Sequence, residues 1–148
     1  HFLRLSKWQG WRCSANALVW ILHLAYLWLP VGLLLLAGAQ VEIVPETAGI
    51  HAFSTGAMAT MILAVMSRAS LGHTGRALFA SREIVASYIL ITIAAVLRVQ
   101  AALSIGDGQA ALAVAGAAWL GAFGLFLFRY GPILCAPRSD ENTKAGQA

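Results

Sequence analysis

Four long blocks of apolar residues, separated by short polar segments, dominate the pattern along the chain. The blocks run near residues 15–39, 47–67, 83–103 and 110–130. A helix needs roughly 20 apolar residues to cross the hydrocarbon core of a bilayer, and each block reaches that length. None of the blocks alternates between polar and apolar positions, as the strands of a transmembrane barrel do. The pattern therefore predicts an all-α fold, a polytopic bundle of four membrane-spanning helices.

Composition agrees with a membrane protein and suggests how the chain is organised. Of its 148 residues, 59% are hydrophobic and 11% are charged, whereas a soluble domain carries about 25% charged residues. The chain begins at His1, and residues 1–12 are too polar for a signal peptide. We therefore expect the C-terminal part of a longer polytopic chain. Its expected parts are a cytoplasmic or interfacial lead-in at 1–14, the helical bundle at 15–135, and a disordered cytoplasmic tail at 136–148.

Charged residues alternate in sign between successive polar segments. The segments before the first block, after the second and after the fourth are basic, while those after the first and third are acidic. By the positive-inside rule, this alternation predicts that both ends of the chain are cytoplasmic. The net charge of +4 then reflects topology and attraction to anionic lipid, with no nucleic-acid partner implied. Cys13 and Cys135 fall on the reducing side and are interpreted as structural.

Small and turn-forming residues predict how the helices pack and end. Small residues recurring every four positions allow close approach of a neighbouring helix. Proline inside a helix predicts a kink, glycine predicts a C-terminal end, and serine predicts an N-cap. The stripes are Ala52, Gly56, Thr60 and Ala64, and Ala113, Ala117 and Gly121; the kink is at Pro30, the helix end at Gly72 and the N-cap at Ser81.

His51, in the outer part of the second block, is a candidate metal or cofactor ligand. In an α-helix, Thr47 and Thr55 lie four residues away on its face. Thr47 would orient the imidazole. Met58, seven residues on, lies close to the same face, and an imidazole with a thioether is a soft site suited to copper. Simple packing is the alternative for Met58.

His73 lies between glycines in the segment after the second block. Gly72 and Gly75 free the backbone to turn N–H groups towards an anion, and Arg76 adds a positive charge. Such a nest suits a haem propionate or a lipid phosphate. A polar turn that merely ends the helix is the alternative.

His23 and Arg98 are the other ionisable side chains inside the blocks. His23 is either a neutral histidine hydrogen-bonded to a neighbouring helix or a haem or metal ligand. Arg98 either snorkels to the surface or pairs with an acidic side chain or a cofactor carboxylate. Helix rise places His23 and His51 roughly 12 Å apart in height. That offset argues against one upright haem held by both histidines.

The stretch around these residues resembles the NnrS family of bacterial membrane proteins. The matching positions are His51, Gly56, residues 61–66 in part, Arg68 and above all Ser70-Leu71-Gly72-His73-Thr74-Gly75-Arg76. Ala59 and Ala77 depart from the expected pattern, where the family commonly has glycine and proline. Both departures concern local backbone shape and remove no candidate ligand.

The resemblance implies a full-length protein of about a dozen helices in the bacterial inner membrane, whose N-terminal helices would partner this part. It implies haem b and copper as cofactors, and a role in the response to nitric oxide and nitrosative stress. It assigns no individual ligands. His51, His73, His23, Met58, Arg76 and Arg98 are therefore proposed from motif match and local chemistry together.

Two other functions stay open from the residues alone. His51, Arg98 and Glu46 could line a proton- or anion-linked transport pathway, or the polar residues could serve only to hold helices together. No hydrolase or transferase constellation is found in the sequence, because Asp107 stands alone and Glu42 and Glu46 are one helical turn apart at the surface. Catalysis is then expected only through a redox cofactor.

Overall fold

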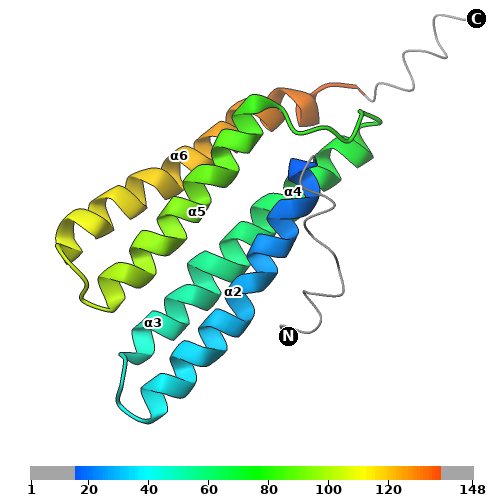
Figure 1. The fold of residues 1–148 in the computed structure, drawn as a ribbon. Helices are drawn as coiled ribbons and strands as arrows, with labels where there is room; N and C mark the ends of the chain where they lie inside the picture. The colour runs from blue at the N-terminus through cyan, green and yellow to red at the C-terminus, as the bar shows by residue number, and fades with distance from the viewer. Residues whose placement is uncertain (1–15, 138–148) are drawn as a thin grey trace, which may run out of the picture.

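The computed structural model describes residues 16–137 and shows four long antiparallel helices (Figure 1). The elements are α2 (Ala17–Gln40), α3 (Glu46–His51), η2 (Ala52–Ala59), α4 (Thr60–His73), α5 (Arg82–Ala102) and α6 (Gly108–Cys135). Since α3, η2 and α4 follow one another without a break, they form one helix, Glu46–His73. All four helices are long and apolar enough to cross a membrane. The all-α fold and the four spans are thus confirmed, and residues 16–137 contain no strand.

The helices form two hairpins that pack against each other. α2 lies along the helix α3–η2–α4, and α5 lies along α6 (Figure 1). The α2–α3 and α5–α6 turns lie at one end of the bundle, and the α4–α5 loop lies at the other (Figure 1). Glu42, Glu46 and Asp107 lie at the turn end, with Arg98 close to it in α5, and Arg68, Arg76, Arg82 and Arg129 lie at the loop end together with Glu83. We call these the acidic end and the basic end.

Side-chain caps fix where two of the helices begin. The Asn16 side chain accepts a hydrogen bond from the Leu18 amide at the start of α2, and the Asp107 carboxylate accepts from two amides in the first turn of α6. Each carboxamide or carboxylate oxygen satisfies amides that the helix leaves unpaired. Ser81 stands at the N-cap position of α5, as predicted, but makes no cap bond. Its hydroxyl accepts instead from Arg129 Nε at 3.2 Å, which ties α6 to α5.

The second helix continues past the end predicted from the sequence. We expected Gly72 to end it, yet Gly72 is helical and the helix runs to His73. Gly75 takes the left-handed conformation (φ 68°) that ends a helix. The expectation for Gly72 was therefore wrong: the last helical residue is His73, and Gly75 takes the turn conformation expected of Gly72, because a solvent-facing glycine can remain helical at modest cost.

The bundle core contains large apolar side chains and small residues from both hairpins. The predicted stripe Ala52, Gly56, Thr60 and Ala64 is buried along its whole length. The second predicted stripe was wrong: Ala113 and Ala117 are exposed. The buried face of α6 is formed by Ala111, Ala115, Ala118, Ala122, Phe126, Tyr130 and Ile133. Both faces of α6 carry small residues, so spacing alone did not distinguish the packed one.

Candidate functional site

His73 lies at the end of α4 and lines a cavity at the basic end of the bundle. This cavity has a volume of about 460 Å³. Arg68 and His73 contribute its charged and titratable groups, and Leu22, Val65 and Leu78 provide an apolar wall. We call this the basic-end pocket. The pocket contains the imidazole and guanidinium from α4 beside aliphatic side chains from α2, α4 and the loop that follows α4.

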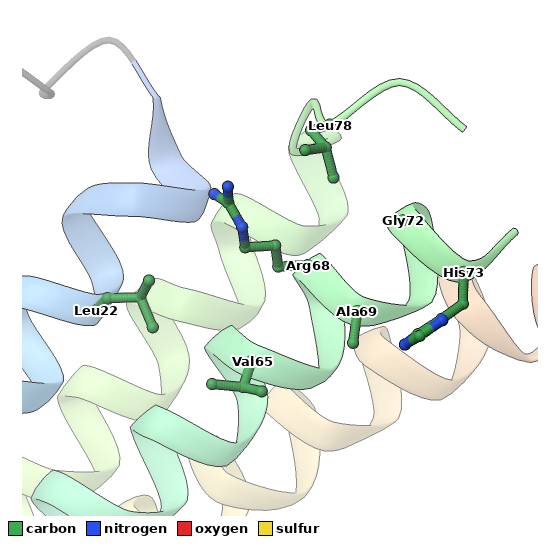
Figure 2. A pocket seen from close by; sticks show the side chains of 7 residues that line it. All are labelled: Leu22, Val65, Arg68, Ala69, Gly72, His73 and Leu78. Carbon is green, nitrogen blue, oxygen red and sulfur yellow. The ribbon is translucent and has the colours of Figure 1, made fainter. Parts of the chain in front are cut away.

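The two polar side chains stand at opposite ends of the pocket. Figure 2 shows Arg68 reaching towards the start of α2, while the His73 ring lies beyond Ala69 on the other side. Both residues are exposed, and neither makes a hydrogen bond or ion pair that the structure shows within residues 16–137. The arrangement suits an elongated ligand with an apolar body better than a compact anion held by both groups.

The backbone of the Gly72–Arg76 turn is already hydrogen-bonded. The Arg76 amide donates to the Leu71 carbonyl at 2.9 Å and the Gly75 amide to the Gly72 carbonyl at 3.3 Å. Together with the positive φ of Gly75, these bonds form a Schellman motif. The amides of Gly75 and Arg76 are therefore committed to helix carbonyls. These N–H groups therefore do not form the expected anion-binding nest. Gly75 instead provides the left-handed conformation that ends the helix.

Arg76 folds back towards the protein. It is half-buried, and its Nη1 atom is buried without a hydrogen-bond partner among the described residues. It does not line the basic-end pocket. Its role as a cofactor-binding residue stays a prediction.

His51 lies near the other end of the bundle, close to Arg98. The two side chains are near enough for their charges to interact. Arg98 of α5 and Thr55 of η2 line a cavity of about 180 Å³ together with Trp119 of α6. We call this the acidic-end cavity. Thr55 therefore shares this cavity with Arg98, whereas His51 does not line it.

A π-helix separates His51 from Met58. Residues Ala52–Ala59 form η2, a stretch of eight residues, where i→i+5 bonds put more residues into each turn than in an α-helix. Seven residues therefore no longer return to the same face. Met58 is 62% exposed and lines an apolar cavity with Met61 and Phe53 that does not include His51. The described residues do not assemble the expected pairing of His51 with Met58.

His23 is held within its own helix. Its Nδ1 lies 3.0 Å from the Val19 carbonyl, one turn earlier in α2. If Nδ1–H donates to this carbonyl, the ring carries its lone pair on Nε2. His23 lies one residue from Leu22 of the basic-end pocket, so it belongs to the same half of the bundle as His73. His51 lies near the acidic end, which keeps it apart from both.

Sequence reasoning missed two contributions to these cavities. Arg68 was named only as a matching family position and a marker of topology and was not predicted as a site residue, yet it lines the basic-end pocket. Trp119 was unremarkable in an apolar block, yet it lines the acidic-end cavity with Arg98. Arg68 and His73 are five positions apart in the sequence, a spacing that signals no shared site. Only the packing of α6 on α5 brings Trp119 to Arg98.

A polar cluster in the core was also missed. The Ser67 hydroxyl donates to the Leu63 carbonyl at 2.7 Å, and Tyr88 and Tyr130 are buried in the same bundle core. The Tyr88 hydroxyl is buried without a well-formed hydrogen bond to the described residues. These groups join α4, α5 and α6 in the bundle core.

The fold and the two cavities define a polytopic α-helical membrane protein with ionisable groups at both ends of its bundle. Within residues 16–137, no three side chains of histidine, cysteine, aspartate or glutamate come together as a metal site. The family model described as NnrS protein matches residues 1–138. The chain therefore belongs to the NnrS family. Comparisons with curated proteins and with solved structures gave no match.

Proposed function

We propose that this chain is part of a haem-binding protein of the bacterial inner membrane that acts in the response to nitric oxide. The observation that carries the proposal is the family match over residues 1–138. Four helices that can span a bilayer place the chain in a membrane. Among the described residues the basic end carries Arg68, Arg76, Arg82 and Arg129 against one acidic residue, Glu83, and this excess of arginine supports a cytoplasmic basic end.

The chemistry of the basic-end pocket fits a b-type haem. An imidazole is the usual protein ligand of haem iron, and a haem needs an apolar surface beside it. His73 offers an imidazole with no hydrogen bond that the structure shows in the described chain, and Leu22, Val65 and Leu78 offer the apolar wall. Arg68 offers a guanidinium suited to a propionate carboxylate. When bound, a ferrous haem with an open position supplies a binding site for nitric oxide.

In this proposal each residue has a separate task. His73 holds the cofactor from the end of α4, and the Schellman motif at Gly75 fixes where that helix ends. Arg68 neutralises the carboxylates of the cofactor on the far side of the pocket. The pocket is open, so the helices that precede this chain in a longer protein would close it and provide any second ligand. His23 is the alternative ligand on the same half of the bundle.

The described residues do not fit a copper site. Copper is bound by sets of imidazole, thiolate or thioether donors, and His51 and Met58 do not share one cavity. Met58 and Met61 share an apolar cavity that contains no third sulfur or imidazole from residues 16–137. A copper site in this protein would need donors from outside the described part of the chain.

The reduced-minus-oxidised absorption spectrum of the purified full-length protein tests the proposal. Haem-supplied protein should show a b-type spectrum that shifts on addition of nitric oxide. His73→Ala should abolish or strongly weaken it, while His51→Ala, near the opposite end of the bundle, serves as the matched control and should leave it intact. A folded protein with no haem signal would overturn the proposal and favour transport. Loss of the signal in His23→Ala alone would move the ligand to α2.

A further inference from the structure

The acidic-end cavity contains hydrogen-bond donors but no acidic side chain from residues 16–137. Its polar lining consists of the Arg98 guanidinium, the Thr55 hydroxyl and the Trp119 indole, set among small and aliphatic residues of α5 and α6. Arginine and tryptophan side chains can only donate hydrogen bonds, and threonine can donate or accept. A cavity with this lining is suited to an acceptor-rich, negatively charged ligand.

The charge of Arg98 is not compensated by the described part of the chain. Arg98 lies in the membrane-spanning helix α5, four residues before its last residue, Ala102. No carboxylate among residues 16–137 lies within 4.0 Å of it. The acidic residues at this end, Glu42, Glu46 and Asp107, are exposed, and the Asp107 carboxylate caps α6. Arginine inside a membrane helix normally pairs or faces a polar cavity, and here it faces the cavity.

His51 adds a second titratable group beside Arg98. Its imidazole lies near enough for electrostatic interaction with the guanidinium, and no described carboxylate forms an ion pair with either group. His51 directly precedes the π-helix η2 and Thr55 lies within it, and π-helical turns frequently occur at functional sites. The Arg98 guanidinium and the Thr55 hydroxyl therefore line one cavity beside the widened helix, and the His51 imidazole lies outside that lining.

The size of the cavity selects among anionic ligands. Sites for drug-sized ligands or cofactors have volumes of about 300–1,000 Å³, whereas this cavity has about 180 Å³. A water molecule occupies roughly 30 Å³ in the liquid. The volume of the cavity is thus sufficient for a small ion with a few waters and too small for a haem. A single guanidinium favours one negative charge.

We propose that the acidic-end cavity binds a small monovalent inorganic anion, with Arg98 as its counter-ion and Thr55 as a hydrogen-bond donor. This site lies near the opposite end of the bundle from the basic-end pocket and does not depend on the haem proposal. The chemistry of the cavity recognises an anion such as nitrate or a halide. A phosphate of an anionic lipid presents similar chemistry, and the experiment must distinguish it.

The test is a nitrate titration of the full-length protein in a neutral detergent, with gluconate keeping the ionic strength constant. The midpoint temperature of unfolding should rise saturably with nitrate, because a ligand that binds the folded state stabilises it. Nitrate should also quench part of the tryptophan fluorescence with the same apparent Kd, and Trp119→Phe should remove that part. Both readouts should persist in His73→Ala, which separates this site from the haem pocket.

Variants of the cavity identify the residues. Arg98→Gln should raise the apparent Kd for nitrate by about 100-fold or more, while Arg68→Gln, at the basic end, should not change it. Thr55→Val keeps the side-chain shape and should weaken binding about tenfold, since a hydrogen bond to a charged group is lost. The Thr55→Val variant still tests the proposal if the Arg98→Gln variant fails to fold.

Three outcomes would overturn the proposal. The first is an absence of saturable nitrate dependence in the unmodified protein. The second is unchanged nitrate dependence in the Arg98→Gln and Thr55→Val variants. The third is stabilisation by phosphatidylglycerol in nanodiscs but not by nitrate, which would assign the cavity to a lipid phosphate.

Discussion

The indole of Trp28 lies directly over the backbone of Gly56, so that a Cβ atom at position 56 would overlap the ring. Similar contacts occur elsewhere between α2 and the second helix. A Cβ at Gly49 would lie 2.6 Å from Leu36, and one at Gly32 would lie 2.9 Å from Phe53. The close approach of these helices therefore depends on glycines from both of them. Such packing, rather than apolar burial, drives helix association inside a bilayer.

Replacing Gly56 should destabilise the bundle. The atoms that a Cβ would meet belong to the inner part of the Trp28 ring, so rotation of a flexible side-chain end cannot relieve the overlap. Gly56→Ala should lower the free energy of unfolding by about 1–3 kcal/mol, as overpacking does elsewhere. Unfolding in mixed micelles with sodium dodecyl sulfate measures this. Gly124→Ala is the control, because a Cβ there meets nothing within 4 Å. Equal stability of the two variants would contradict the contact.

Replacing Gly75 should weaken the end of α4. Its positive φ of 68° costs an L-residue roughly 1–2 kcal/mol. Gly75→Ala should therefore reduce the free energy of unfolding by about 1 kcal/mol, and Gly75→Asn by less, because asparagine tolerates this conformation. The same unfolding assay applies. Gly72→Ala, three residues earlier in regular helix, should be neutral or slightly stabilising. If Gly72→Ala proved the more harmful change, the helix would end where the sequence first suggested.

Removing the Ser87 hydroxyl should loosen the α5–α6 hairpin slightly. Ser87 Oγ donates to the Ala122 carbonyl at 2.9 Å, and both residues are buried. Hydrogen bonds between membrane helices contribute about 0.6 kcal/mol on average, so Ser87→Ala should cost about that amount. Thr92→Val is the comparison, since the Thr92 hydroxyl bonds within its own helix, to the Tyr88 carbonyl. A larger effect of Thr92→Val would argue against the interhelical bond.

Removing the charge of Arg68 should weaken haem retention under the proposed function. Arg68→Gln takes away the cation opposite His73 in the basic-end pocket but leaves the imidazole. Haem dissociation should accelerate roughly tenfold, as expected for one lost hydrogen bond to a charged group. The positions of the absorption bands should not change. Transfer of haem to an excess of apomyoglobin measures the rate. Arg82→Gln, at the same end of the bundle but outside the pocket, should leave the rate unchanged.

The helix count and class followed from the sequence because length and apolar composition decide whether a helix crosses a bilayer. The ends of the helices were harder to predict from the sequence. Gly72 and Gly75 look alike in the sequence, and only the hydrogen bonds of Arg76 and Gly75 show which of them ends α4. The packed face of α6 was also hidden, since alanine occupies both its buried and its exposed positions.

The candidate sites were partly predictable. The four-residue spacing of His51 and Thr55 predicted that they share one side of their helix; Thr55 lines a cavity with Arg98, and His51 lies within electrostatic range of the same arginine. The seven-residue spacing predicted that Met58 lies on the same face as His51. The π-helix between them removes this shared face, because seven residues make two full turns only in an α-helix. Arg68 and Trp119 reach their cavities through packing between helices, which a single sequence does not encode locally.

The shortness of the two turns at the acidic end has a practical consequence for mapping topology by proteolysis. Residues 41–45 and 103–107 contain no lysine or arginine, so trypsin supplied from that side finds no cleavage site in either turn. The loop between α4 and α5 at the opposite face contains Arg76. Sealed vesicles that expose the acidic end and sealed vesicles that expose the basic end should therefore give different tryptic digests of the same protein. The asymmetry would reveal which face of the membrane the pocket of His73 opens to.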